Sequence, residues 1–185
     1  MQTKNASEKS WYVLRDLSRP NTKTPAYKVL QEMPAFSNNV FVPMKQHVST
    51  KCGKHVVNLV PYIPDLLFVH TCREVLDPVI NEIPTLQYRY VRGGYQYQAM
   101  IVRENVMNDF IKAVEQIDLV QYYRPEDVSA RFFGKKIRII GGHLNGFTGR
   151  LMSQRGSKVK RLIIDLEECQ LSAAIQVQPE YIQLI

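Results

Sequence analysis

The sequence contains few side chains that could hold a metal ion or form a disulfide pair. Its three cysteines, Cys52, Cys72 and Cys169, are far apart, and no two have the two-residue spacing of a zinc knuckle or a redox pair. The four histidines form no ligand pair at helical spacing. We therefore expect no metal ion and no cofactor, and we interpret the cysteines as structural thiols.

Long apolar runs and catalytic motifs are also missing. No stretch of about 18 apolar residues occurs, so no membrane-spanning helix is expected. Residues 1–10 are polar, which predicts a disordered tail, no cleavable signal sequence and a cytoplasmic protein. No nucleophile stands near a base at motif spacing, and the acidic residues are scattered. The sequence therefore does not predict an enzyme.

Positive charge is concentrated towards the end of the chain. Residues 131–185 hold 9 Lys and Arg against 4 Asp and Glu, whereas residues 1–130 hold 15 against 13. Such a segment attracts phosphate backbones through counterion release, although a solvated surface that keeps a domain soluble has the same composition. The basic residues that we place near nucleic acid as a hypothesis are Lys135, Lys136, Arg138, Arg150, Arg155 and Lys158.

The first part of the chain alternates strand and helix patterns. Strands are expected at residues 11–14, 40–42, 56–60 and 66–69, and the last of these is a continuous apolar run typical of a central strand. Residues 45–54 are polar and basic and contain Gly53, which indicates a hairpin or loop. Thr24 and Pro25 form a favourable helix start, with the hydroxyl as cap. A second helix is expected around residues 71–83, where Pro78 either restarts or kinks it, and a third covers residues 106–114.

Tyrosines flank the pair Gly93-Gly94 and predict two strands joined by a tight turn. Tyr88, Tyr90, Tyr95 and Tyr97 could form a stacking platform for single-stranded bases. Cross-strand packing explains them more simply, and we favour it.

The remainder of the chain contains only strand and turn patterns. Residues 118–130 have little periodicity and are interpreted as a linker. Short strands are then expected at residues 136–140, 149–152, 161–166, 173–178 and 181–184. A small closed barrel is more economical for such strands than an open sheet with exposed edges.

A glycine-rich turn within this second part carries the most specific signal. Gly142, Gly146 and Gly149 lie between two apolar strands, with Leu144 and Phe147 as apolar plugs. Glycine reaches positive φ without steric cost, as a tight reversal requires. A structural turn explains these glycines better than a nucleotide-binding loop, because the Lys-Ser or Lys-Thr ending and the following helix are missing. The strand residues expected to face inward are Ile137, Ile139 and Leu151. The spacing resembles a KOW motif, which is found mostly in proteins that work on RNA polymerase or the ribosome.

An α/β unit that opens on Trp11-Tyr12-Val13 and is followed by a linker and a KOW segment resembles the NusG family of transcription elongation factors. The likeness extends from residue 11 to residue 185. Residues 62–69 match the family's apolar strand, with Pro64-Asp65-Leu66 where the family has Pro-Gly-Tyr. His143 stands where proline is common in the KOW motif. Within the family the chain is most similar to specialised antitermination paralogues, including the UpxY type of Bacteroides.

The resemblance implies an α+β protein. A ferredoxin-like α/β sandwich, the NusG N-terminal-like domain, would cover residues 11–117, and a small SH3-like β-barrel, the KOW domain, would cover residues 131–185. The first domain would dock on the clamp helices of RNA polymerase. The residues implied in this contact are Pro64, Leu66, Phe68 and Tyr88. Strand alternation places Leu66 and Phe68 on one face, with Tyr88 alongside, although a plain core strand has the same pattern.

We therefore predict a monomeric transcription elongation or antitermination factor that suppresses pausing or termination, with nucleic acid of the elongation complex as a further contact. The sequence leaves open whether a ribosomal protein or a termination factor binds the KOW domain. A ribosome- or RNA-associated KOW protein acting in translation is the alternative, and the long N-terminal α/β part argues against it. Some family members refold the second domain into a helical hairpin; here its Ile, Val and Gly content favours the barrel.

Overall fold

The computed structural model describes residues 8–19, 22–51, 54–91, 97–115, 120–124, 134–153 and 159–185. The chain forms two compact units, Met1–Glu104 and Asn105–Ile185. Residues 1–7 of the predicted tail lie outside the described residues, and Ser10 already belongs to the first strand.

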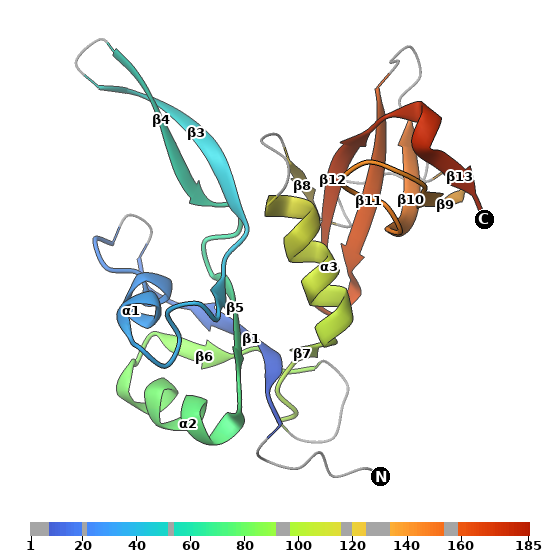
Figure 1. Ribbon diagram of the computed structural model, residues 1–185. Helices are drawn as coiled ribbons and strands as arrows, with labels where there is room; N and C mark the ends of the chain where they lie inside the picture. The colour runs from blue at the N-terminus through green and yellow to red at the C-terminus, as the bar shows by residue number, and fades with distance from the viewer. Residues whose placement is uncertain are drawn as a thin grey trace. The chain divides into compact units, whose positions relative to one another are not determined.

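A five-stranded antiparallel sheet forms the centre of the N-terminal unit (Figure 1). Its strands are β1 (Ser10–Asp16), β2 (Val40–Phe41), β5 (Leu66–Thr71), β6 (Leu86–Tyr88) and β7 (Ile101–Val102). The order is β2-β5-β1-β6, and β7 also pairs with β1. Strand β5 is therefore central, as its continuous apolar run predicts.

Two helices cover one face of this sheet. Helix α1 (Ala26–Glu32) contributes Leu30 and helix α2 (Arg73–Glu82) contributes Leu76 to a core that also holds Leu14 and Val69 from the strands. Helix α2 continues through Pro78, which resolves the alternative that the sequence leaves open.

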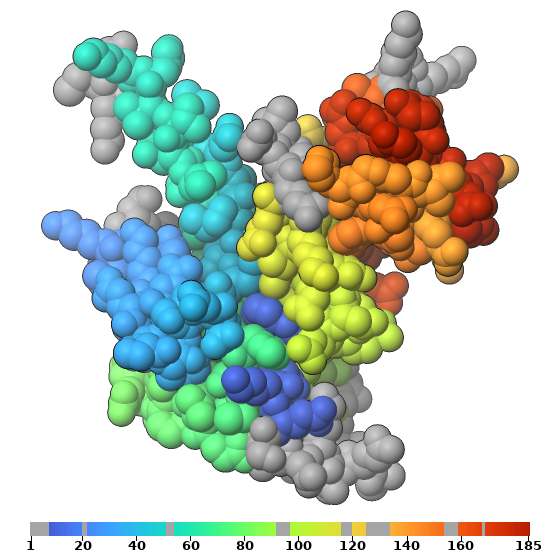
Figure 2. Space-filling model, viewed as in Figure 1, coloured from blue at the N-terminus to red at the C-terminus, as the bar shows by residue number. Residues whose placement is uncertain are grey.

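Strands β3 (Met44–Lys51) and β4 (Lys54–Pro61) pair only with each other and form a two-stranded sheet. This hairpin extends as an arm from the rest of its unit (Figures 1 and 2). Residues 45–51 and Lys54 of the basic segment thus belong to the hairpin strands, and Gly53 lies outside the described residues.

The C-terminal unit contains helix α3, which spans Glu104–Glu115, and a six-stranded antiparallel sheet. The strands are β8 (Gln121–Tyr123), β9 (Lys136–Ile139), β10 (Thr148–Ser153), β11 (Lys160–Leu166), β12 (Leu171–Val177) and β13 (Ile182–Leu184), in the order β13-β9-β10-β11-β12-β8. Two short 3-10 helices, η3 (Glu167–Cys169) and η4 (Pro179–Tyr181), flank β12.

All five strands expected after residue 131 are present. Residues 121–123, within the predicted linker at 118–130, form β8 and pair with β12. Residues 118–119 and 125–130 lie outside the described residues, so the linker stays a prediction. The two compact units divide at the start of α3, whereas the sequence places the linker at residues 118–130. Among the described residues no pairing joins β13 to β8, so the closed barrel stays a prediction.

Both faces of this sheet carry buried apolar residues: Met152, Ile163 and Ala174 form a core cluster on one face, and the residues that follow lie on the other. Ile137 and Ile139 of β9 are buried, and Leu162 and Ile175 are register partners that are both fully buried. Leu151 is the partner of Leu162 and shares this face, as expected for an inward strand residue. Within the described part of the chain, no helix is long and apolar enough to cross a membrane.

Candidate functional site

The sheet face opposite α1 and α2 holds two of the residues implied in polymerase binding. The β1–β5 register pairs Val13 with Phe68, Arg15 with Leu66 and Trp11 with His70, and cross-strand partners share a face. Leu66 and Phe68 are 1% and 0% exposed, so they are buried in this structure. Pro64, just before β5, is exposed. We refer to Trp11, Val13, Arg15, Leu66, Phe68 and His70 as the Phe68 face.

Tyr88 lies on the other face of the sheet, which corrects its expected position beside Leu66 and Phe68. Its register partner is Leu14, which also pairs with Leu67. The Tyr88 hydroxyl donates a hydrogen bond of 2.8 Å to Asp77 Oδ1, and its ring contacts Tyr12. Burial, reinforced by this hydrogen bond and by the charge of Asp77, raises the pKa of Tyr88. Tyr88 is therefore a core residue of the α1/α2 side.

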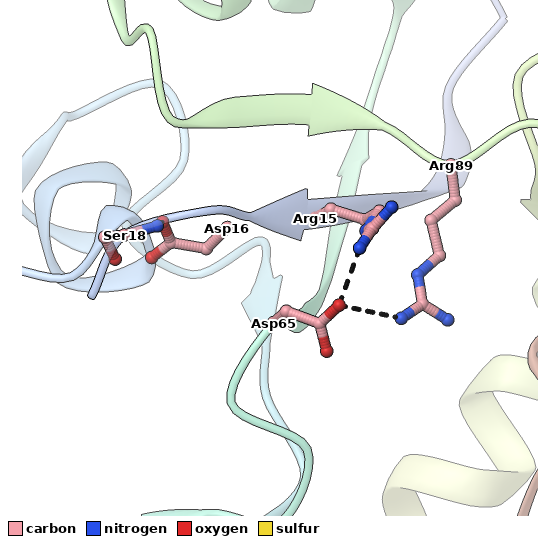
Figure 3. Close-up of polar contacts among 5 residues, drawn as sticks. All are labelled: Arg15, Asp16, Ser18, Asp65 and Arg89. Carbon is pink, nitrogen blue, oxygen red and sulfur yellow. Dashed lines mark hydrogen bonds and ion pairs between the residues drawn. The ribbon is translucent and has the colours of Figure 1, made fainter. Parts of the chain in front are cut away.

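Asp65 connects two arginines at the edge of the Phe68 face (Figure 3). Its Oδ2 atom accepts hydrogen bonds from Arg15 Nε and Arg89 Nη2, each at 3.3 Å. The three side chains are partly exposed, so the ion pairs contribute at most about 1 kcal/mol each. The Asp65 carbonyl also accepts the backbone N–H of Asp16 at 3.2 Å. Asp65 thus has a structural role here.

Asp16, at the end of β1, links the sheet to α1 through backbone hydrogen bonds. Its Oδ2 accepts the N–H of Ala26 at 2.7 Å, and its Oδ1 accepts the N–H of Ser18 at 2.9 Å; Figure 3 shows Asp16 beside Ser18. Asp16 is 5% exposed, so these bonds are shielded from water. The sequence predicts Thr24 as the cap of α1. The residue before the helix is instead Pro25, which makes no side-chain cap hydrogen bond, and Asp16 accepts the N–H of the first helical residue.

Trp11 and His70 form an aromatic stack at the opposite edge of the Phe68 face. Their ring centroids are 5.0 Å apart. His70 Nε2 lies 3.8 Å from Glu104 Oε1, a distance that allows an ion pair when the imidazole is protonated but no hydrogen bond. Neither His70 Nε2 nor Trp11 Nε1 has a hydrogen-bond partner among the described residues. No sequence motif signals this cluster.

The described residues also contain no group of three or more His, Cys, Asp or Glu side chains able to hold a metal ion.

The glycine-rich turn uses its glycines in two different ways. Gly142 and Gly146 have φ of 65° and 89°, which is the left-handed conformation that the sequence predicts. Gly149 does not adopt it; a Cβ there would lie 2.3 Å from the carbonyl oxygen of Ile163 in the neighbouring strand. Leu144 is buried as the expected plug, and Phe147 is half-buried.

The basic residues proposed to lie near nucleic acid differ in their exposure and in whether an acidic side chain pairs with them. Lys135, Lys136 and Arg138 are exposed. Arg150 instead binds Asp165 Oδ2 through Nε at 3.1 Å and Nη2 at 2.5 Å. Its positive charge is therefore largely neutralised. The remaining two positions, Arg155 and Lys158, lie outside the described residues.

Three of the four tyrosines near Gly93-Gly94 pack against one another. The Tyr88 and Tyr90 rings are 6.3 Å apart, and Tyr90 and Tyr97 meet edge to face at 5.7 Å. Tyr90 also forms an isolated antiparallel β-bridge with Ala99. The contact between Tyr90 and Tyr97 is of the kind that cross-strand packing predicts, but the two side chains are 45% and 77% exposed, so the stacking platform stays an open alternative. Tyr95 lies outside the described residues.

Residues 9–111 match the model of the family described as "Transcription termination factor nusG". The matched segment is more than half of the 185 residues and includes every residue of the Phe68 face. The chain belongs to the NusG family. NusG proteins are transcription factors rather than enzymes, and they generally bind RNA polymerase. No curated protein sequence matches the chain. The glycine-rich turn lies beyond the matched segment, so its KOW character and the likeness to UpxY-type paralogues stay predictions.

Proposed function

We propose that this NusG-family protein is a transcription elongation and antitermination factor that binds RNA polymerase through its N-terminal domain and shortens pauses. The observation that carries the proposal is the family match over residues 9–111, which includes the sheet that contains the Phe68 face. Binding that is tighter to the closed, active clamp than to the paused state would shift the paused population towards elongation.

The proposed polymerase surface is centred on Pro64, Leu66 and Phe68. Apolar side chains in the middle and charged ones at the edge are the usual anatomy of a protein interface. Arg15, Asp65 and Arg89 supply such an edge. Leu66 and Phe68 are buried in this structure, so binding at this surface requires that both become accessible in the complex.

Residues 131–185 are proposed to form a KOW domain that recruits a further partner, either a ribosomal protein or a termination factor. The positive φ of Gly142 and Gly146 and the tight fit at Gly149 support a KOW turn. Among the described residues of this domain, Lys135, Lys136 and Arg138 are the exposed basic residues that we place near nucleic acid. The family match in the N-terminal unit favours this proposal over a translation-associated KOW protein.

A purified system tests the proposal. The full chain is mixed with core RNA polymerase from its own organism, and separately with ribosomes, and complexes are separated by gel filtration. Pause lifetimes are measured on a template with defined pause sites, with and without the protein. We expect co-elution with polymerase and shorter pauses. Co-elution with ribosomes alone, and unchanged pausing, would favour the translation-associated alternative.

A further inference from the structure

One aspartate holds two arginines beside the Phe68 face. Arg15 lies in β1 and Arg89 directly follows β6, and both side chains reach Asp65, which directly precedes β5 (Figure 3). Both hydrogen bonds end on the same atom, Asp65 Oδ2. Among the described residues, no other acidic side chain pairs with either arginine. The cluster therefore has two positive charges against one negative charge, and it carries a positive charge in excess.

The hydrogen bond to Asp65 leaves the outer edge of the Arg15 guanidinium available. Asp65 accepts the Nε–H of Arg15, whereas the amino groups Nη1 and Nη2 donate to no side chain within the described part of the protein. The Arg15 side chain is 47% exposed, so these groups are accessible from outside. A carboxylate matches this edge, because its two oxygens accept two parallel N–H bonds from a guanidinium.

Arg89 adds positive charge at the same place. Strand β1 lies between β5 and β6 in the sheet, so the Arg89 side chain extends across β1 to reach Asp65. This side chain is only 25% exposed, and its buried Nε has no hydrogen-bond partner among the residues that the structure describes. Salt screens a partly buried charge less than an exposed one. Arg89 therefore strengthens the attraction of an anion towards Arg15.

The surroundings of the cluster favour a protein carboxylate over a nucleic-acid phosphate. Leu66 is the register partner of Arg15 in β5, and Pro64, next to Asp65, is exposed. Arginine beside apolar residues is typical of the residues that contribute most to protein–protein binding. Nucleic-acid interfaces are much more positively charged, whereas Asp65 here neutralises one of the two arginines.

We propose that Arg15, supported by Arg89, binds an aspartate or glutamate side chain on the RNA polymerase surface that meets the Phe68 face. This inference rests on the proposed polymerase contact and names its chemistry, an acidic side chain next to apolar ones. It makes Arg15 a specificity-determining residue, because a polymerase that lacks the acidic group leaves the guanidinium without a partner in the complex.

The affinity of the full chain for core RNA polymerase from its own organism, without nucleic acid, tests the inference. We expect Arg15→Gln to bind at least about tenfold more weakly, as variants of central interface arginines do. This difference should narrow as salt is added, because salt screens the lost attraction. Arg15→Lys keeps the charge but loses the planar fork of donors, so its affinity should lie between those of Arg15→Gln and the unchanged protein.

Arg73→Gln is the matched control. Arg73 is also an exposed arginine whose Nε pairs with an aspartate, at 3.4 Å from Asp77 Oδ2. It belongs to α2, which covers the other face of the sheet. The control makes the same change of charge away from the Phe68 face, so it should bind polymerase like the unchanged protein. Circular dichroism checks that each variant is folded.

The possible failures are distinguishable. If Arg15→Gln binds polymerase as tightly as the unchanged protein does, the inference is wrong while the polymerase contact stands. An equal loss in Arg73→Gln would show that only net charge matters, and this too overturns it. Anisotropy with labelled DNA, without polymerase, covers the other occupant: a loss confined to DNA binding would identify a phosphate at Arg15. If the unchanged protein does not bind polymerase, the proposed function fails and the inference fails with it.

Discussion

Asp16 at the end of β1 accepts a hydrogen bond of 2.7 Å from the backbone N–H of Ala26, the first residue of α1. This bond fixes the start of a short helix whose own preceding residue offers no side-chain cap. The same carboxylate also accepts a hydrogen bond from the backbone N–H of Ser18. The β1–α1 connection therefore depends on one buried acidic side chain.

Replacing Asp16 with Ala should destabilise the N-terminal unit by about 1–2 kcal/mol, because the loss of a helix cap has this cost and a second backbone donor loses its acceptor. Asp16→Asn retains one carbonyl oxygen and should cost less. The only tryptophan, Trp11, lies in β1, so its fluorescence reports the urea midpoint of this unit. Equal midpoints for the Ala variant and the unchanged protein would contradict the capping role.

Gly149→Ala should destabilise the glycine-rich turn more than Gly146→Ala. A methyl group at position 149 would meet a backbone oxygen at 2.3 Å, whereas at position 146 nothing lies within 4 Å and only the positive φ is unfavourable. We expect about 2 kcal/mol or more for the first variant and about 1 kcal/mol for the second. Amide hydrogen exchange over β10 and β11 measures the effect. Slower exchange in Gly149→Ala than in Gly146→Ala would refute the steric explanation.

Stability should fall at alkaline pH partly because of Tyr88. Its pKa in the folded protein is raised above the ordinary value of 10.0, first by burial and then by Asp77. As the pH rises, the unfolded chain therefore loses the hydroxyl proton of Tyr88 at a lower pH than the folded protein does. The contribution of Tyr88 to stability is complete below about pH 10, and it is lost as the pH rises above that value, by up to about 1.4 kcal/mol per pH unit.

Thermal unfolding between pH 8 and pH 11 checks this dependence. Tyr88→Phe should be slightly less stable at pH 8, because it loses the hydrogen bond to Asp77, but its melting temperature should fall less steeply above pH 10. All other ionisable groups are the same in both proteins, so the difference between the curves isolates Tyr88. Parallel curves would argue against an un-ionised, buried phenol.

Local signals in the sequence predict the elements that short-range chemistry determines. The apolar run at residues 66–69 identifies the central strand, and Gly142 and Gly146 identify the turn that needs positive φ. Both features depend on residues that are adjacent in the chain. The three helices follow for the same reason, because their apolar periodicity is local.

Contacts between distant segments are not predictable in this way. Asp65 binds Arg15, which is 50 residues away, and no spacing rule connects them. The position of Tyr88 depends on the register between β1 and β6, and a shift by one residue exchanges the faces of a strand. Strand β8 has only three residues and is stabilised by pairing with β12, so its own sequence carries little signal.

The comparison that tests polymerase binding most directly uses two neighbouring residues of β5. Phe68 and Leu67 are both buried, at 0% and 2% exposed, but they point to opposite faces of the sheet. Phe68→Ala and Leu67→Ala each remove buried apolar volume and should both destabilise the fold by roughly 2–5 kcal/mol. A charged residue at Leu66 would be a poorer choice, because burying an unpaired charge would unfold the unit.

The decisive measurement is the affinity of these two variants for RNA polymerase, at a temperature where circular dichroism shows both to be folded. We predict that Phe68→Ala binds at least tenfold more weakly, equivalent to about 1.4 kcal/mol, whereas Leu67→Ala binds like the unchanged protein. Equal affinities for the two variants, or a loss confined to Leu67→Ala, would contradict the assignment of the Phe68 face as the polymerase surface.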